Sequence, residues 1–138
     1  MSWLDDVRKV FDKYQIPDYI WLAIMACESG GDPKARNGTG EESRGLFQIN
    51  IKANPKYAGL DLYDPVVNAE VAARDFIAPA YRKAKDEGME DPLEYAEYVW
   101  RYGIQPYWDE AHKRTIRKYA EQVLKGNFKL PAEQNAAK

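Results

Sequence analysis

Residues 20–28 read Ile20-Trp21-Leu22-Ala23-Ile24-Met25-Ala26-Cys27-Glu28, and this stretch decides the fold. Eight apolar residues in a row predict a buried helix, and they are too few to span a membrane. Pro17-Asp18 ahead of the run is typical of a helix start, and Ser29-Gly30-Gly31 after it is typical of a helix end. The sequence therefore predicts a buried central helix that ends on a carboxyl group.

Glu28 is for this reason the first candidate for a functional residue. Helix carbonyls direct the negative end of the macrodipole toward its carboxyl group, and the apolar neighbours withdraw water from it. Both effects raise the pKa of a carboxyl group, as a general acid that works near neutral pH requires. Taken alone, a Glu before two glycines more often caps a surface helix, so the rest of the sequence has to decide between these interpretations.

Hydrophobic spacing is helical along most of the chain. The spacing and the turn signals predict helices at about residues 3–14, 17–28, 64–88, 91–103 and 108–125. Pro79 lies inside the third of these and is expected to bend or break it. Residues 30–45 predict an extended loop, and residues 43–51 a short irregular or β-like segment.

These elements predict a mainly α single domain of about five to seven helices. The 138 residues of the chain fit one domain with a sizeable core. We expect the domain to occupy residues 1–126. Residues 127–138 are expected to form a poorly ordered tail, because that tail has little to bury.

The composition argues against several function classes. The chain has 20 Lys and Arg against 22 Asp and Glu, a formal net charge of -2, which argues against a nucleic-acid surface. Cys27 is the one cysteine and His112 the one histidine, so we expect no intrachain disulfide, no zinc site and no cofactor. A catalytic pair of Cys27 and His112 is a less favoured alternative, because the two lie far apart in the sequence.

The first residues do not have the pattern of a signal peptide. Met1-Ser2-Trp3-Leu4-Asp5-Asp6 is acidic and amphipathic rather than basic and then apolar. No apolar stretch is long enough to span a membrane. We therefore expect either a protein released by other means or one module of a larger assembly, such as a tail or secretion apparatus.

Three segments keep polar or aromatic residues that a simple helical bundle does not need. They are Glu28-Ser29-Gly30-Gly31-Asp32-Pro33-Lys34-Ala35, Ser43-Arg44-Gly45-Leu46-Phe47-Gln48-Ile49 and Tyr98-Val99-Trp100-Arg101-Tyr102-Gly103. The first matches the pattern Glu-Ser-x-x-x-Pro-x-Ala, and the second has a Ser shortly before Gly-Leu-x-Gln-Ile. With these motifs, the chain from about residue 17 to 125 resembles the lysozyme-like catalytic domain of soluble lytic transglycosylases, relatives of goose-type lysozyme. The helix start Asp64-Pro65-Val66-Val67-Asn68 is a further feature shared with that family.

The resemblance implies an enzyme that cleaves the β-1,4 bond between MurNAc and GlcNAc in peptidoglycan glycan strands, outside the cytoplasm. Glu28 would protonate the leaving oxygen and then act as a base, with the N-acetyl group of the substrate assisting. Attack by the C6 hydroxyl would leave a 1,6-anhydro-MurNAc product. Ser43 and Gln48 would hydrogen-bond the acid or the N-acetyl group, and Trp100, Tyr102 or Tyr107 would offer a flat face to a sugar ring.

The chain departs from the family in the third motif. Where the family has Ala-Tyr-Asn-x-Gly, this chain has Val99-Trp100-Arg101-Tyr102-Gly103. The change keeps an aromatic face and replaces a neutral amide by a fixed cation. Arg101 is expected either to meet a carboxylate of the peptide stem or, as the slightly preferred alternative, to pair with Glu94 or Glu97.

Two alternatives stay open at this level. Hydrolysis would use a second carboxylate, for which Asp32, Glu41 and Glu42 are the nearby candidates, and the protein would then be a muramidase. The other alternative is a non-catalytic wall-binding module on the same scaffold. Glu28 argues against such a module, because wall binding does not need a carboxyl group in an apolar setting.

Overall fold

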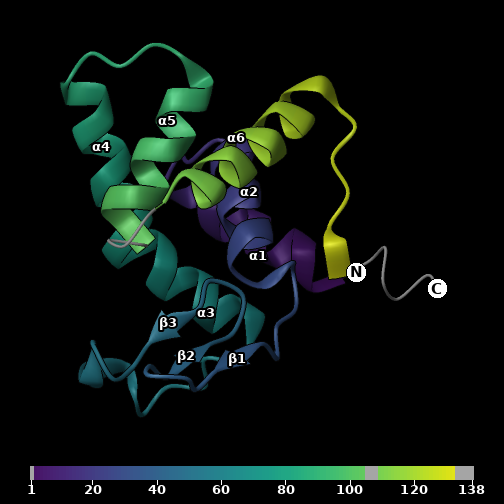
Figure 1. Cartoon of the computed structure of the whole chain (residues 1–138). Helices are drawn as coiled ribbons and strands as arrows, with labels where there is room; N and C mark the ends of the chain where they lie inside the picture. Colours follow the sequence, from purple (N-terminus) through teal and green to yellow (C-terminus); the bar gives the residue numbers. More distant parts are fainter. Residues whose placement is uncertain (1, 105–108, 133–138) are drawn as a thin grey trace.

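The computed structural model describes residues 2–104 and 109–132, and helices dominate it (Figure 1). The α-helices are α1 (Ser2–Lys13), α2 (Asp18–Ser29), α3 (Pro65–Val71), α4 (Ala78–Asp86), α5 (Pro92–Val99) and α6 (Glu110–Lys125). Three two-residue strands, β1 (Arg36–Asn37), β2 (Ser43–Arg44) and β3 (Ile49–Asn50), pair antiparallel in that order. The prediction of a mainly α fold with a short β-like segment near residues 43–51 is confirmed. Strand β1, however, lies inside what the sequence predicted as an extended loop.

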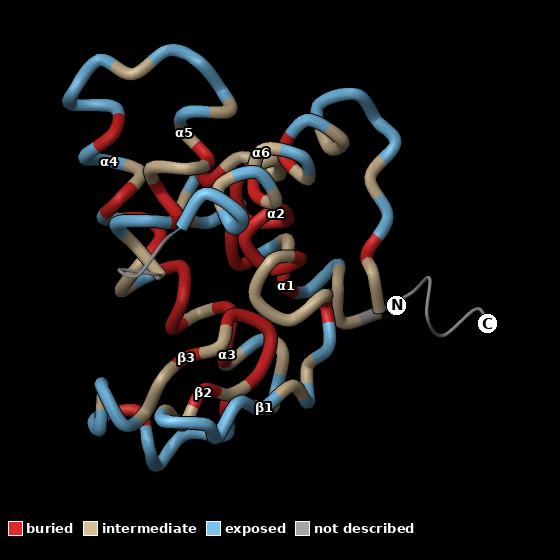
Figure 2. Tube along the Cα trace, in the orientation of Figure 1, coloured by how far each residue is buried: buried red, intermediate tan, exposed pale blue. Residues whose placement is uncertain are grey.

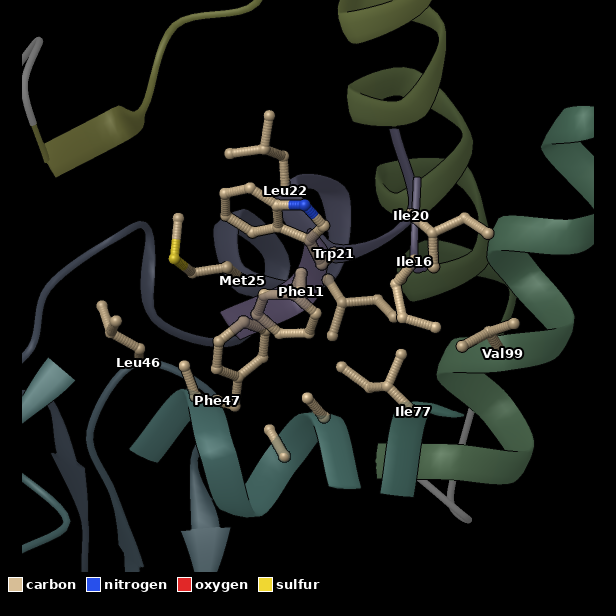
Figure 3. Close-up of a cluster of buried hydrophobic side chains, with 14 of the residues drawn as sticks. Phe11, Ile16, Ile20, Trp21, Leu22, Met25, Leu46, Phe47, Ile77 and Val99 are labelled. Atoms are coloured by element: carbon tan, nitrogen blue, oxygen red, sulfur yellow. The ribbon is translucent and has the colours of Figure 1, made fainter. Parts of the chain in front are cut away.

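Helix α2 forms the centre of the hydrophobic core, as its composition predicts. Every residue from Ile20 to Ala26 is buried (Figure 2). The ring of Trp21 stacks on that of Phe11 in α1 at a centroid distance of 4.9 Å, and Phe47 packs on the same Phe11 ring at 5.3 Å (Figure 3). Because α2 is packed on all sides, its last turn has a fixed place in the molecule.

The sheet and α3 lie at one end of the molecule, and α4, α5 and α6 lie at the other (Figure 1). The buried side-chain amide of Asn68 in α3 holds the turn after β2 through three hydrogen bonds. Its Oδ1 accepts from Phe47 N at 2.9 Å. Its Nδ2 donates to the carbonyl oxygens of Arg44 at 2.8 Å and Leu62 at 2.9 Å. Gly45 in that turn has a φ of 79°, and a Cβ there would lie 2.1 Å from Leu62 O. Only glycine fits this close approach, which explains the glycine of the second motif.

Two π-helical segments, η2 (Ala72–Ile77) and η3 (Trp100–Ile104), extend α3 and α5. At the end of η2 the Ala78 N–H donates to the Ala73 carbonyl, five residues back. Pro79 then lies in the first turn of α4, where its missing N–H costs little. The helix does not break at Pro79, because residues 65–86 stay helical throughout. The hydrogen bonding changes instead, from α-helical to π-helical over residues 72–77 and back to α-helical from Ala78.

The last helix, α6, begins at Glu110, directly after Asp109. Asp109 caps α6, because its Oδ1 accepts from His112 N at 2.8 Å. Trp108, the predicted start of this helix, lies outside the described residues. Across the described ranges, no helix has the length and apolar character that a membrane crossing needs.

The chain after Gly126 returns to the domain. Leu130 is 2% exposed and packs against Gly31, and Ala132 N donates to Gly30 O at 2.8 Å. The expectation that this segment has little to bury is therefore wrong for residues 128–132. Residues 133–138 lie outside the described part of the chain.

Candidate active site

Glu28 lies in the last turn of α2, beside Trp100 of η3. Trp100 Nε1 donates to Glu28 Oε1 at 2.8 Å across 72 residues of sequence. The ring of His112 in α6 stacks against Trp100 at a centroid distance of 5.6 Å, and His112 Nδ1 lies 2.9 Å from Asp109 Oδ1. Residues from three parts of the chain therefore meet at one carboxyl group.

These surroundings raise the pKa of Glu28 from 4.5 to about 7. Burial is the largest cause, because the ionised carboxylate loses its hydration. The Trp100 hydrogen bond and the charge of His112 act in the opposite direction, and the charge of Glu41 adds to the rise. A carboxyl group with a pKa near 7 is able to donate a proton and to accept one at neutral pH.

Glu28 faces a cleft of about 800 Å³, a volume in the range of ligand-binding sites. The sheet end of the molecule contributes uncharged amide side chains to this cleft, namely Asn37, Gln48, Asn50 and Asn54. The two π-helical segments contribute Phe76, Tyr102 and Ile104. Amides beside aromatic and apolar side chains suit a sugar chain, which has hydroxyl groups at its edges and C–H groups on its faces.

Ser43 and Gln48 both line the cleft, and both are bound to other protein groups. The Ser43 hydroxyl donates to Glu41 Oε2 rather than to the acid. Gln48 Nε2 donates to the carbonyls of Ala35 at 3.2 Å and Gly45 at 3.0 Å. Since both N–H groups of this amide serve the backbone, its Oε1 is the atom left to accept from a ligand.

Glu41 is the one of the three candidate second carboxylates that lines the cleft. Asn37 Nδ2 donates to its Oε1 at 2.9 Å, and the Ser43 hydroxyl donates to its Oε2. Two donors therefore fix the orientation of this carboxylate in the same cleft as Glu28.

Glu42 and Asp32 have structural partners instead. Arg36 Nε lies 2.7 Å and Arg44 Nε 3.1 Å from Glu42 Oε1, and these hydrogen bonds lower the pKa of Glu42 to about 2. Asp32 Oδ1 accepts from Lys34 N at 2.9 Å in an exposed turn. Neither side chain lines the cleft.

The aromatic residues of the third motif differ in their surroundings. Trp100 is 1% exposed and does not line the cleft, so its ring supports Glu28 from within the protein. Tyr102 is 55% exposed and lines the cleft, which makes it the aromatic face open to a sugar ring. Tyr107, the third candidate, lies outside the described residues.

Arg101 also lines the cleft, with its guanidinium carbon 5.1 Å from the centroid of the Tyr102 ring. The ion pair of Arg101 with Glu94 or Glu97, the slightly preferred expectation, stays a prediction. Glu97 pairs with Arg117 of α6, across the helix interface rather than along its own helix. A cation therefore stands at the edge of the cleft where the family pattern has an amide.

Two cleft residues, Cys27 and His112, could not be placed together from the sequence, because no local spacing links residues 27 and 112. Burial, assisted by the charge of Glu28, raises the pKa of the Cys27 thiol to about 12. A thiol with that pKa supplies almost no thiolate at neutral pH, which disfavours catalysis by a Cys27–His112 pair. Within residues 2–104 and 109–132, no group of three His, Cys, Asp or Glu side chains is arranged to hold a metal ion.

A half-buried glutamic acid with a pKa near 7 that faces a polar cleft has the properties that a general acid in glycoside cleavage requires. The family described as "Lysozyme like domain" matches residues 15–75, the segment that contains Glu28, Ser43 and Gln48. This match supports a lysozyme-like domain, and the mainly helical architecture with its small three-stranded sheet is consistent with a lysozyme-like single domain. This family indicates a glycosidase-type enzyme that acts on peptidoglycan. No curated protein and no solved structure matches the chain.

Proposed function

We propose that the protein cleaves the β-1,4 bond between MurNAc and GlcNAc in peptidoglycan, outside the cytoplasm, with Glu28 as the general acid. The observation that carries this proposal is the Glu28 carboxyl group, with a pKa of about 7, at the edge of the 800 Å³ cleft. Near neutral pH about half of such groups are protonated. Transfer of that proton to the leaving oxygen is the help that an oxocarbenium-like transition state needs.

The proposed reaction ends in a 1,6-anhydro-MurNAc product. Glu28 gives its proton to the glycosidic oxygen as the C1–O bond breaks, and the N-acetyl oxygen of MurNAc bonds to C1. The Glu28 carboxylate then takes the proton of the C6 hydroxyl, whose oxygen displaces the N-acetyl oxygen from C1. A single group with a pKa near 7 suits both steps.

The other site residues have supporting roles in this proposal. Trp100 positions the acid through its indole N–H, which donates to Glu28 Oε1. Gln48 Oε1 accepts from the N–H of the N-acetyl group, because its Nε2 is bound to the backbone. Tyr102 stacks on a sugar ring with its exposed face.

Hydrolysis with Glu41 as a second carboxylate is the other candidate reaction. The observation that favours it is the orientation of Glu41 by Asn37 and Ser43 in the cleft that Glu28 faces. A carboxylate held in this way suits a base that activates water on the opposite face of the sugar. The two reactions differ in their products, which carry anhydro ends or reducing ends.

Digestion of purified cell walls tests the proposal. We expect the wild-type protein and the exposed-site control Glu90→Gln to clear the walls, and Glu28→Gln to lose this activity while staying folded. Undiminished clearing by Glu28→Gln would overturn the role of Glu28. Wall binding without released muropeptides from the wild-type protein would instead show a non-catalytic module.

Mass spectrometry of the released muropeptides distinguishes the two reactions. Anhydro ends, with product type unchanged in Glu41→Gln, are the expected result. Reducing ends that disappear in Glu41→Gln but persist in Glu42→Gln would favour hydrolysis.

A further inference from the structure

His112 lies beside the acid's main support, and the proposed reaction does not use it. It belongs to the first turn of α6, a helix that packs on both α2 and α5 (Figure 1). Its ring stacks against Trp100 of η3, with 5.6 Å between the ring centroids and 22° between the ring planes. His112 also lines the cleft that Glu28 faces. Its position therefore connects the cleft with the residue that donates to the acid.

Asp109 fixes both the backbone and the ring of His112. One carboxylate oxygen, Oδ1, accepts from the His112 backbone N–H at 2.8 Å and lies 2.9 Å from the ring atom Nδ1. These two hydrogen bonds lower the pKa of Asp109, so its carboxylate is ionised at neutral pH and only accepts. The ring proton is therefore on Nδ1, and the helix cap also holds the orientation of the imidazole.

The fixed ring of His112 covers Trp100 on its cleft side. His112 lines the cleft, whereas Trp100 does not line it and is 1% exposed. Trp100 Nε1 donates to Glu28 Oε1 at 2.8 Å, and a water molecule that reached the indole would compete for this hydrogen bond. The stack therefore restrains the indole and keeps water from the contact that orients the acid.

The ionisable groups around His112 come from several elements. They are Cys27 and Glu28 of α2, Glu41 before β2, Arg101 of η3 and Asp109 before α6. Among the described residues, the hydrogen bond of the His112 ring is made to Asp109, and its connection to Glu28 runs through the Trp100 ring. This geometry favours a role in orientation over a role in proton transfer.

We propose that His112 is a positioning residue for the reaction, which holds Trp100 against Glu28 and keeps water from the hydrogen bond between them. This inference rests on the proposed function, because it takes Glu28 to be the general acid. An acid with one fixed orientation meets the glycosidic oxygen in the geometry that the transition state requires. Loss of that orientation lowers kcat, while other residues of the cleft still bind the substrate, so KM changes little.

Steady-state cleavage of soluble peptidoglycan strands tests this role with two variants of His112. His112→Ala removes the ring, and we expect kcat to fall about ten-fold with KM within about two-fold of the wild type. His112→Phe keeps a flat ring on Trp100 but has no ring nitrogen, and it should keep kcat within about three-fold. The control Arg114→Ala changes an exposed residue of α6 that does not line the cleft, and it should match the wild type.

A double-mutant cycle tests whether His112 acts through Trp100. Trp100→Phe has already lost the hydrogen bond that His112 protects, so adding His112→Ala to this variant should lower kcat by less than about two-fold more. A further loss of about ten-fold would mean that His112 acts directly on the substrate or on the acid, and it would overturn the proposal.

Two other outcomes would overturn the role of His112 and leave the proposed function intact. One is a His112→Phe variant as inactive as His112→Ala, which would assign a ring nitrogen to proton transfer or to substrate binding. The other is an unchanged kcat in His112→Ala, whatever its thermal stability, while Glu28→Gln is inactive. Failure of the wild-type protein to cleave the strands would overturn the proposed function and the role of His112 together.

Discussion

Replacement of Glu28 by Gln is expected to stabilise the protein above neutral pH. The pKa of Glu28 is about 7 in the folded protein, against 4.5 for an ordinary glutamic acid. Below pH 4.5 both the folded and the unfolded chain hold the proton, so Glu28 does not penalise folding there. As the pH rises from 4.5 to 7, the unfolded chain releases the proton while the folded chain keeps it, and the free energy of unfolding falls.

The magnitude follows from the two pKa values. One pKa unit corresponds to about 1.4 kcal/mol, so ionisation of Glu28 costs the folded protein about 3 kcal/mol once the pH exceeds 7. Gln has nearly the same shape and no charge to bury, and it still offers an oxygen to the Trp100 N–H. The variant therefore avoids this cost.

Urea unfolding at pH 4 and at pH 8.5 measures the effect. We expect the stability difference, Glu28→Gln minus wild type, to grow by about 3 kcal/mol between the two pH values. Glu90→Gln, which makes the same substitution at an exposed carboxyl group, serves as the matched control. A flat difference for Glu28→Gln would refute the argument, because it would mean that the carboxylate is as well solvated in the folded chain as in the unfolded one.

Three further predictions concern the supports of the site and of the fold. Trp100→Phe removes the N–H that lowers the pKa of Glu28, so the alkaline limb of the pH profile of wall clearing should move to higher pH while kcat falls about ten-fold. Gly45→Ala should destabilise the protein by about 3 kcal/mol or more in thermal unfolding, because the new Cβ would lie 2.1 Å from a carbonyl oxygen. The control Gly40→Ala has a similar positive φ but no atom within 4 Å of the new Cβ, so it should cost about 1–2 kcal/mol. Leu130→Ala should cost about 2–4 kcal/mol if the segment after Gly126 is part of the core, and a loss below about 0.5 kcal/mol would show that it is not.

Helix positions were largely predictable because their signals are local. Asp64 and Asp91, each followed by a proline, were expected to begin helices, and both side chains accept hydrogen bonds from backbone N–H groups of the first turn. The π-helical segments were not predictable, because the change from four-residue to five-residue hydrogen bonding depends on packing against neighbouring elements. The burial of Leu130 had no local signal either, since it depends on a space beside Gly31.

By itself, the sequence determined that an apolar helix ends at Glu28 and that Ser43 and Gln48 follow on a short β-like segment. The tertiary structure alone decided what surrounds the acid, because Trp100 and His112 reach it from more than 70 residues away. It also decided between neighbouring carboxylates: Glu41 lines the cleft, while Glu42, the next residue, is bound by two arginines. The physical reason is that the pKa and orientation of a carboxyl group depend on burial and on nearby donors and charges, and the fold brings these together from distant parts of the chain.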